Sequence, residues 1–173
     1  RSANHEALRR HHGNGMSVLD LDYRARFWPS EQDATAQVQQ ALEHVDVAIG
    51  NLEECRIAVG ETDPDAAALA LLERGVEVAV VKQGMMGTLV RTATERVYVP
   101  VTNVRVRNGL GAGDGFGLLQ GWDLARTFAF ASAAGAIVAS RLECSTAMPR
   151  IDEVERLMAA NPQVVPVVSR IRH

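Results

Sequence analysis

The sequence predicts an α/β fold in which a mostly parallel sheet is covered by helices on both faces. Short apolar runs that suit buried strands alternate with segments whose apolar residues recur at helical spacing. Polar residues follow several of the strand-like runs, as at Asp22, Asn51 and Lys82. Ligands of such sheets bind beyond the carboxyl ends of the strands, and we call that edge the rim. We therefore expect these three residues and the turn Gly111–Asp114 to share the rim.

The composition describes an ordinary globular domain. The 173 residues are 47% hydrophobic and carry a formal net charge of −3, which suits one buried core. The arginines are scattered, so nucleic acid is not an expected partner. No apolar run has the length that a membrane span needs, so no membrane association is expected. Cys55 and Cys144 lack CxxC spacing, which suits packing in a reducing cytoplasm.

The first hundred residues predict regular alternation of the two element types. Asp63 and Pro64 form a helix start, and Gly75 closes that helix. Met85 and Met86, in the turn after one strand, are expected to pack against apolar neighbours. The expected helices span 2–12, 34–44, 52–59 and 64–74, and the expected strands span 16–22, 45–49, 76–81, 88–91 and 96–100.

The remaining residues contain one extended piece and two helices. Residues 103–107 suit a strand, and residues 151–159 suit a short helix. Residues 123–141 form a helix with almost no charge inside it, which favours a buried core helix. Its small residues also allow the close approach of a flat ligand such as adenine. The tail from Pro162 onward gives only a weak pattern, and His11–His12, which has no third ligand at metal spacing, is expected at the surface.

The stretch Asn108–Gly117 contains the sequence Gly-Ala-Gly-Asp at 111–114. Glycines allow the backbone to approach a ligand closely, and the first amides of a following helix lack partners within it. Amides arranged in this way bind anions such as a phosphoryl group. Asp114 would then be placed to accept a proton from an attacking hydroxyl. The alternative is a glycine-rich turn in which Asp114 is an ordinary helix cap.

This stretch resembles the second signature of the ribokinase (PfkB-type) carbohydrate kinases. The longer string Asn108–Asp114 is similar to one branch, the 5-dehydro-2-deoxygluconokinases of inositol breakdown. The resemblance implies a ribokinase-like three-layer α/β/α fold. It also implies that Asp114 is the catalytic base and that the amides of Gly111, Ala112, Gly113 and Asp114 form the anion hole.

Two further motifs resemble the metal and nucleotide sites of the family. Asn51-x-x-Glu54 is similar to the motif that organises Mg²⁺ and phosphate, although Asn and Glu are also common in first turns of helices. The run Val80–Gly87 resembles the strand and turn beside the nucleotide phosphates, where Lys82, Gly84 and Gly87 would bind ATP. A solvated lysine in a glycine turn is the alternative.

The substrate and adenine segments are also similar to those of the family. Asp20, Asp22 and Arg24, followed by Phe27 and Trp28, resemble the Asp-x-Asn-x-Arg…Trp run of kinases that act on keto-deoxy sugar acids. Arg24 would pair with a substrate carboxylate, and Asp22 stands where some relatives have Asn. A solvated loop is the alternative for Arg24 and Arg26. Gly135 and Ala136 lie in a segment similar to the one near adenine, where Ser132 replaces a frequent Asn.

The resemblance covers almost the whole chain as the C-terminal, nucleotide-side half of one ribokinase-like domain, 1–173. The N-terminal half, which supplies most sugar contacts and a lid, is absent. We expect residues to be missing before residue 1 and roughly six to be missing between Gly117 and Leu118. The helix after Asp114 is too short to cross a sheet without them.

The sequence as a whole predicts an ATP- and Mg²⁺-dependent sugar-acid kinase of the cytoplasm that acts on 5-dehydro-2-deoxygluconate. One alternative is another kinase of the same fold, for 2-keto-3-deoxygluconate, ribose or a nucleoside. A truncated, non-catalytic nucleotide-binding module is the other. A homodimer is compatible with the sequence, which does not fix the oligomeric state.

Overall fold

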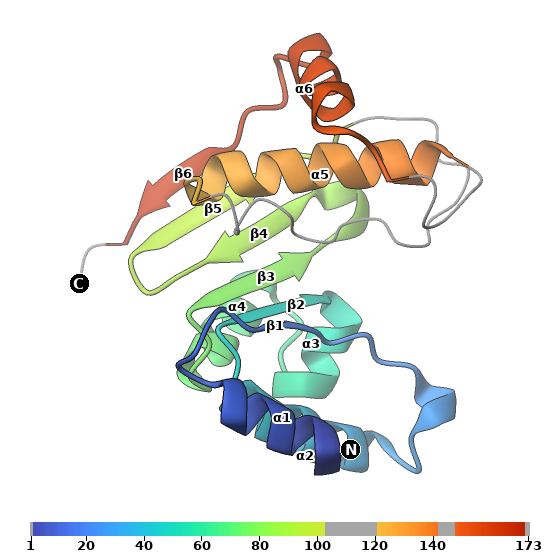
Figure 1. Cartoon of the computed structure of the whole chain (residues 1–173), viewed down its shortest axis with the longest axis vertical. Helices are drawn as coiled ribbons and strands as arrows, with labels where there is room; N and C mark the ends of the chain where they lie inside the picture. Colours follow the sequence, from blue (N-terminus) through green and yellow to red (C-terminus); the bar gives the residue numbers. More distant parts are fainter. Residues whose placement is uncertain (1, 103–120, 142–147, 172–173) are drawn as a thin grey trace. The chain divides into compact units, whose positions relative to one another are not determined.

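The computed structural model describes residues 2–102, 121–141 and 148–171. Six strands hydrogen-bond in the order β1-β2-β3-β4-β5-β6 (Figure 1). Contacts divide the chain into two compact units. The first comprises residues 1–84, 89–96 and 170–173, and the second comprises residues 85–88 and 97–169. Each unit is described by itself below.

Three parallel strands form the centre of the first unit. They are β1 (Val18–Asp20), β2 (Val47–Asn51) and β3 (Val78–Lys82). Asp20 lies opposite Ile49, and Asn51 lies opposite Lys82. Residues that alternate along β2 and β3 are buried whichever face they point to. This burial confirms the expectation of strands covered on both faces.

Helices connect these strands. The first unit contains α1 (Ser2–His11), the 3₁₀ helix η1 (Ala25–Phe27), α2 (Glu31–Leu42), α3 (Leu52–Val59) and α4 (Pro64–Glu73). Its core is formed by aliphatic side chains of α2, α3, α4 and the strands, among them Leu42, Leu71 and Val81. Capping explains the helix starts. Ser30 accepts from the amide of Asp33 at 3.1 Å, so α2 begins three residues before the predicted position. Asp63 caps α4 as predicted.

Of the remaining strands, two lie where the sequence predicts them and one was not predicted. Strands β4 (Thr88–Arg91) and β5 (Glu95–Val99) lie where they are predicted. Strand β6 (Val167–Arg170) lies in the tail, for which the sequence predicts no element, and all its residues are exposed. It was missed because a strand without a buried face has no alternating pattern. The predicted strand 103–107 lies outside the described residues.

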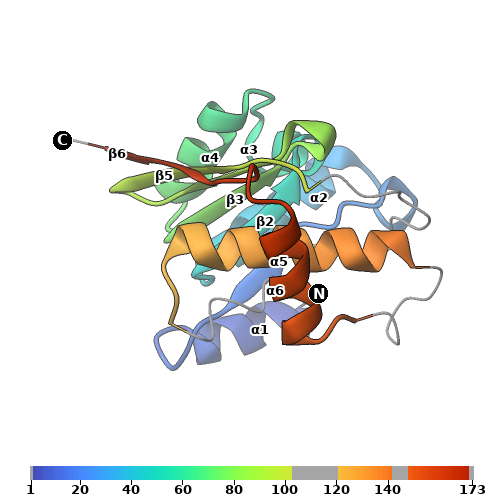
Figure 2. The ribbon, with the colours of Figure 1, turned by 90° about the horizontal axis from the view of Figure 1, so that it is seen from above.

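The second unit contains the helix pair α5 (Leu124–Ser140) and α6 (Ile151–Ala160). Figures 1 and 2 show α6 lying crosswise on α5. Phe130 and Ala133 of α5 pack with Val154 of α6, and the Trp122 ring lies edge-on to Phe130 at 5.2 Å. Nine residues of α5 are buried. These contacts confirm the prediction of a buried core helix.

Candidate functional site

The rim consists of the carboxyl ends of β1, β2 and β3 with the turns that follow them. β1 ends at Asp20, β2 ends at Asn51 and β3 ends at Lys82. Because the strands are parallel and adjacent, these ends lie at one edge of the sheet. The structure thus confirms that Asp22, Asn51 and Lys82 share the rim. The Gly111–Asp114 turn, expected beside them, lies outside the described residues.

The turn after β1 positions Asp22 and Arg24. Asp22 has φ +28, a region that non-glycine residues rarely adopt. Its amide donates to Oδ1 of Asp20 at 3.2 Å. Arg24 Nε donates to Oδ1 of Asp22 at 2.9 Å, and both side chains are more than half exposed. The guanidinium predicted to bind a substrate carboxylate is therefore accessible, and it is already held by a carboxylate.

The predicted metal motif at the end of β2 forms a capping box. Asn51 Oδ1 accepts from the amide of Glu54 at 2.9 Å, and Glu54 Oε2 accepts from the amide of Asn51 at 2.7 Å. Glu54 is buried. The two residues thus fix each other at the start of α3. The oxygen of Asn51 is used in this cap, and Oε1 of Glu54 is the carboxylate oxygen outside it.

Gly50 permits close packing directly beneath this motif. A Cβ at Gly50 would lie 2.5 Å from Cδ1 of Leu21 and 3.3 Å from Cβ of Glu54. Leu21 is held over it because its amide donates to the carbonyl of Ile49 at 2.8 Å. Position 50 therefore requires glycine, because Leu21, the first residue after β1, packs against the backbone of β2 there.

Lys82 faces the acidic side of the rim. Its Nζ lies 3.8 Å from Oδ1 of Asp20, and its side chain is 31% exposed. The buried thiol of Cys55 lies nearby, and its burial, together with the charge of Glu54, raises the pKa of Cys55 to about 12. This thiol is a packing residue, as predicted, and it stays protonated at neutral pH.

The turn after Lys82 requires its glycines and exposes its methionines. Gly84 has φ +58 and Gly87 has φ +88. Within the second unit, a Cβ at Gly87 would collide with the carbonyl of Val99. Met85 and Met86 are 79% and 68% exposed, so the prediction that they pack is wrong. They lie in the 3₁₀ helix η2 (Gly84–Met86), which buries no residue.

The predicted adenine residues lie on α5, in the second unit. Gly135 is buried and Ala136 is half-buried. Buried alanines and Val138 flank Gly135 along this helix. Gly135 and Ala136 thus belong to the second unit, whereas the described rim belongs to the first.

Two rim residues received no role of their own from the sequence, although Asp20 is the first residue of the Asp-x-Asn-x-Arg run. Asp20 accepts from the Asp22 amide and contacts Lys82, while Gly50 makes room for Leu21. The signal for Asp20 was its place in that run, two residues before Asp22. Gly50 gave none, since a glycine at a strand end is ordinary.

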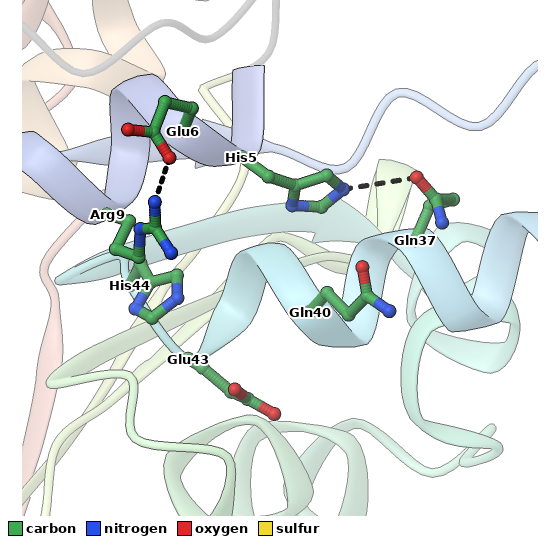
Figure 3. Close-up of a pocket in the computed structure, with 7 residues that line it drawn as sticks. All are labelled: His5, Glu6, Arg9, Gln37, Gln40, Glu43 and His44. Carbon is green, nitrogen blue, oxygen red and sulfur yellow. Dashed lines mark hydrogen bonds and ion pairs between the residues drawn. The ribbon is translucent and has the colours of Figure 1, made fainter. Parts of the chain in front are cut away.

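A cleft of about 490 Å³ lies away from the rim, between α1 and α2. His5 of α1 faces Gln37 of α2 across it, with Nε2 3.2 Å from Oε1 (Figure 3). Arg9 pairs with Glu6 on the same helix. The lining of this cleft mixes charges of both signs, and the described residues that line it include none of those predicted to bind substrate, metal or nucleotide.

The described residues were also searched for metal clusters and membrane spans. Among them, no group of three or more His, Cys, Asp or Glu side chains is placed to hold a metal ion. Within the same residues, no helix combines the length and apolarity that crossing a membrane requires. His11 and His12 are exposed, as predicted.

Comparison with known proteins identifies the family of the chain. Residues 3–151 match the pfkB family carbohydrate kinase model. A 5-dehydro-2-deoxygluconokinase from Geobacillus thermodenitrificans is 32% identical over 165 residues, which are 88% of this chain and 48% of that protein. The chain thus spans about half the length of this relative.

Solved structures give the same answer for the fold. A fructokinase from Xylella fastidiosa with bound ATP has a TM-score of 0.81 at 25% identity, over 93% of this chain and 57% of that one. A protein assigned as ribokinase II from E. coli, in complex with ATP and Mg²⁺, has a TM-score of 0.75 at 25% identity, over 85% of this chain and 49% of that one. The ribokinase-like α/β fold is confirmed, and the chain belongs to the pfkB family of carbohydrate kinases.

Proposed function

We propose that this protein uses ATP to phosphorylate the terminal hydroxyl of a sugar acid, 5-dehydro-2-deoxy-D-gluconate. The observation that carries the proposal is the rim. Three adjacent strand ends bring Arg24, Glu54 and Lys82 to one edge of the sheet, in the chain order of the family motifs. Membership in the pfkB family and the name of the Geobacillus relative support the same chemistry.

The substrate carboxylate is assigned to Arg24. Its guanidinium is accessible and is held by one exposed carboxylate, Asp22. A substrate carboxylate can share or replace that partner, and bidentate pairing with arginine gives orientation as well as charge neutralisation. This assignment favours a sugar acid over ribose or a nucleoside, which offer no carboxylate to Arg24.

The charges of the rim explain why a divalent cation is needed. The described rim carries three carboxylates, on Asp20, Asp22 and Glu54. Each of these carboxylates would repel a bare triphosphate. Mg²⁺ typically binds one or two carboxylates, several waters and the phosphates. It would therefore neutralise phosphate charge at this site.

The donor set fits an indirect role in holding Mg²⁺. Asn51 Oδ1 is engaged by the amide of Glu54, while the Glu54 carboxylate uses only Oε2 in the cap. We assign Glu54 to a water of the hydrated Mg²⁺ and Asn51 to fixing Glu54. The E. coli neighbour that was solved with ATP and Mg²⁺ is consistent with this cofactor set.

The nucleotide and the chemical step are assigned from the sequence motifs. Lys82, Gly84 and Gly87 would contact the phosphates, and Gly135 with Ala136 would lie near adenine. Asp114 would take the proton of the attacking hydroxyl, and the amides of Gly111, Ala112, Gly113 and Asp114 would stabilise charge on the γ-phosphoryl group. Phosphoryl transfer depends mainly on such positioning and electrostatic stabilisation.

A substrate panel tests the proposal. ATP turnover is measured with 5-dehydro-2-deoxygluconate, 2-keto-3-deoxygluconate, ribose and a nucleoside, using the printed chain and any longer polypeptide that contains it. We expect the highest kcat/KM with 5-dehydro-2-deoxygluconate. Preference for another substrate would move the protein to another activity of the family. ATP binding without turnover would favour the non-catalytic module.

The Asp114→Asn variant tests the assignment of the base. A base that accepts the hydroxyl proton contributes about 10²–10⁴-fold to the rate. We expect kcat to fall by that factor while the Kd of Mg·ATP stays within about twofold, because the amide side chain keeps the size of the acid. Glu155→Gln, a surface carboxylate on α6, is the control. Unchanged turnover in Asp114→Asn would exclude the role as base.

A further inference from the structure

We propose that Asp20 is a positioning residue that joins the nucleotide side of the rim to the sugar-acid side. The inference rests on the proposed function and concerns the first residue of the Asp-x-Asn-x-Arg run, to which the sequence assigned no role of its own. The inference is based on the two contacts of one carboxylate oxygen. Oδ1 of Asp20 lies 3.8 Å from Nζ of Lys82 and also accepts the amide of Asp22 at 3.2 Å.

The strand register explains how Asp20 reaches both sides. Asp20 lies level with Ile49 of β2, which lies level with Val80 of β3, so Lys82 stands two residues farther along the sheet. Side chains two residues apart on a strand point to the same face. Lys82 therefore leans back across the end of β2 toward Asp20.

The Lys82 contact is weak enough to be exchanged for a ligand. A separation of 3.8 Å exceeds the length of a hydrogen bond, so the attraction is mainly Coulombic. Both side chains remain accessible, with 31% of Lys82 and 45% of Asp20 exposed. A phosphate, which carries more charge than one carboxylate, can draw Lys82 away. Asp20 therefore competes with the nucleotide for Lys82.

The Asp22 contact has the opposite consequence. Oδ1 of Asp20 accepts from the amide of Asp22, which stands in the turn at φ +28. This turn presents Arg24, whose guanidinium pairs with Asp22. Loss of the acceptor would release the turn and weaken sugar-acid binding. Asp20 thus opposes binding on one side of the rim and supports it on the other.

Two substitutions at this position separate the two effects. Asp20→Asn removes the charge but keeps an oxygen that accepts the Asp22 amide. We expect the Kd of Mg·ADP, measured by calorimetry at fixed ionic strength, to fall about two- to fivefold, while KM for the sugar acid stays near its original value. Asp20→Ala removes both contacts, so KM for the sugar acid should also rise severalfold. A residue that only stabilised the fold would weaken both ligands.

Two controls test whether Asp20 acts on nucleotide binding through Lys82. Glu77→Gln removes an exposed carboxylate at the other end of β3 and should change neither ligand. In a Lys82→Gln background, Asp20→Asn should no longer tighten Mg·ADP, because the competition acts through Lys82. If Asp20→Asn folds normally and binds Mg·ADP equally well or more weakly, the inference is wrong. If the unmodified protein binds no Mg·ADP and turns over no substrate, the proposed function fails and this inference fails with it.

Discussion

The two ends of the same three strands are built differently. At the amino-terminal end, Oδ2 of Asp46 accepts from the amide and the hydroxyl of Ser17 at 2.6 and 2.7 Å. The carbonyl of Asp46 accepts from the amides of Glu77 and Val78 at 2.9 and 3.0 Å. One residue therefore ties β1, β2 and β3 together where they begin.

At the carboxyl-terminal end, the side-chain contacts between strands are longer and more exposed. The charge contact between Asp20 and Lys82 spans 3.8 Å, and the Arg24–Asp22 pair joins residues of a single turn. Short, charge-assisted hydrogen bonds contribute more to stability than exposed ion pairs do. The comparison indicates that the register of the sheet is fixed at one end, which leaves the side chains at the other end able to change partners.

Removing the Asp46 side chain should have the largest effect on stability. Asp46→Ala eliminates two hydrogen bonds to a carboxylate, and we expect a loss of about 2–3 kcal/mol in the free energy of unfolding. Urea unfolding measures it, with Glu77→Gln as a neighbouring control that should change stability by less than about 0.5 kcal/mol. A loss no larger than that of the control would mean that this end does not fix the sheet.

The stability loss of the Asp46→Ala variant should also depend on pH. Desolvation by itself would raise the pKa of Asp46, but the hydrogen bonds from Ser17 outweigh it and hold the pKa below its ordinary value of 3.8. A lowered carboxyl pKa stabilises the folded state above the ordinary value, and that stabilisation is lost as the pH falls through the folded-state pKa. The difference between wild type and Asp46→Ala should therefore be full at pH 7 and shrink below about pH 4.

Gly50→Ala should have the next largest effect. The new Cβ would meet Leu21 at 2.5 Å, and overpacking of this kind costs about 1–2 kcal/mol. Combining it with Leu21→Ala removes the crowding, so the double variant should be more stable than the sum of the single changes predicts. Additive losses in urea unfolding would show that the cost of Gly50→Ala does not come from contact with Leu21. The position is instructive because this rim residue serves packing rather than ligand binding.

Lys82→Gln should change stability least. Its ion pair is long and partly exposed, so the free energy of unfolding should change by less than about 0.5 kcal/mol. Mg·ADP affinity, in contrast, should fall about tenfold if Lys82 contacts a phosphate. Calorimetry and urea unfolding on the same preparation give both values. A destabilised variant with unchanged nucleotide affinity would make Lys82 a structural residue.

Much of the first unit could be predicted from the sequence. Helix α3 matches its predicted range, and α4 begins at the predicted Pro64, because the signals there are local. A capping residue, a proline at the first helical position and an apolar period all act within a few residues. Membership in the family also followed from short motifs. The strand β6 and the exposure of Met85 and Met86 could not be predicted in this way, since burial depends on neighbours distant in sequence.

The sequence by itself determined the α/β class, the order of elements and the chemical types of side chain that follow each strand. Only the tertiary structure decided that one oxygen of Asp20 would meet both Lys82 and the Asp22 amide, and that Gly50 would lie under Leu21. The reason is physical. Propensity and capping act between residues close in the chain, whereas these contacts depend on the register between strands tens of residues apart, which the packing of the whole sheet sets.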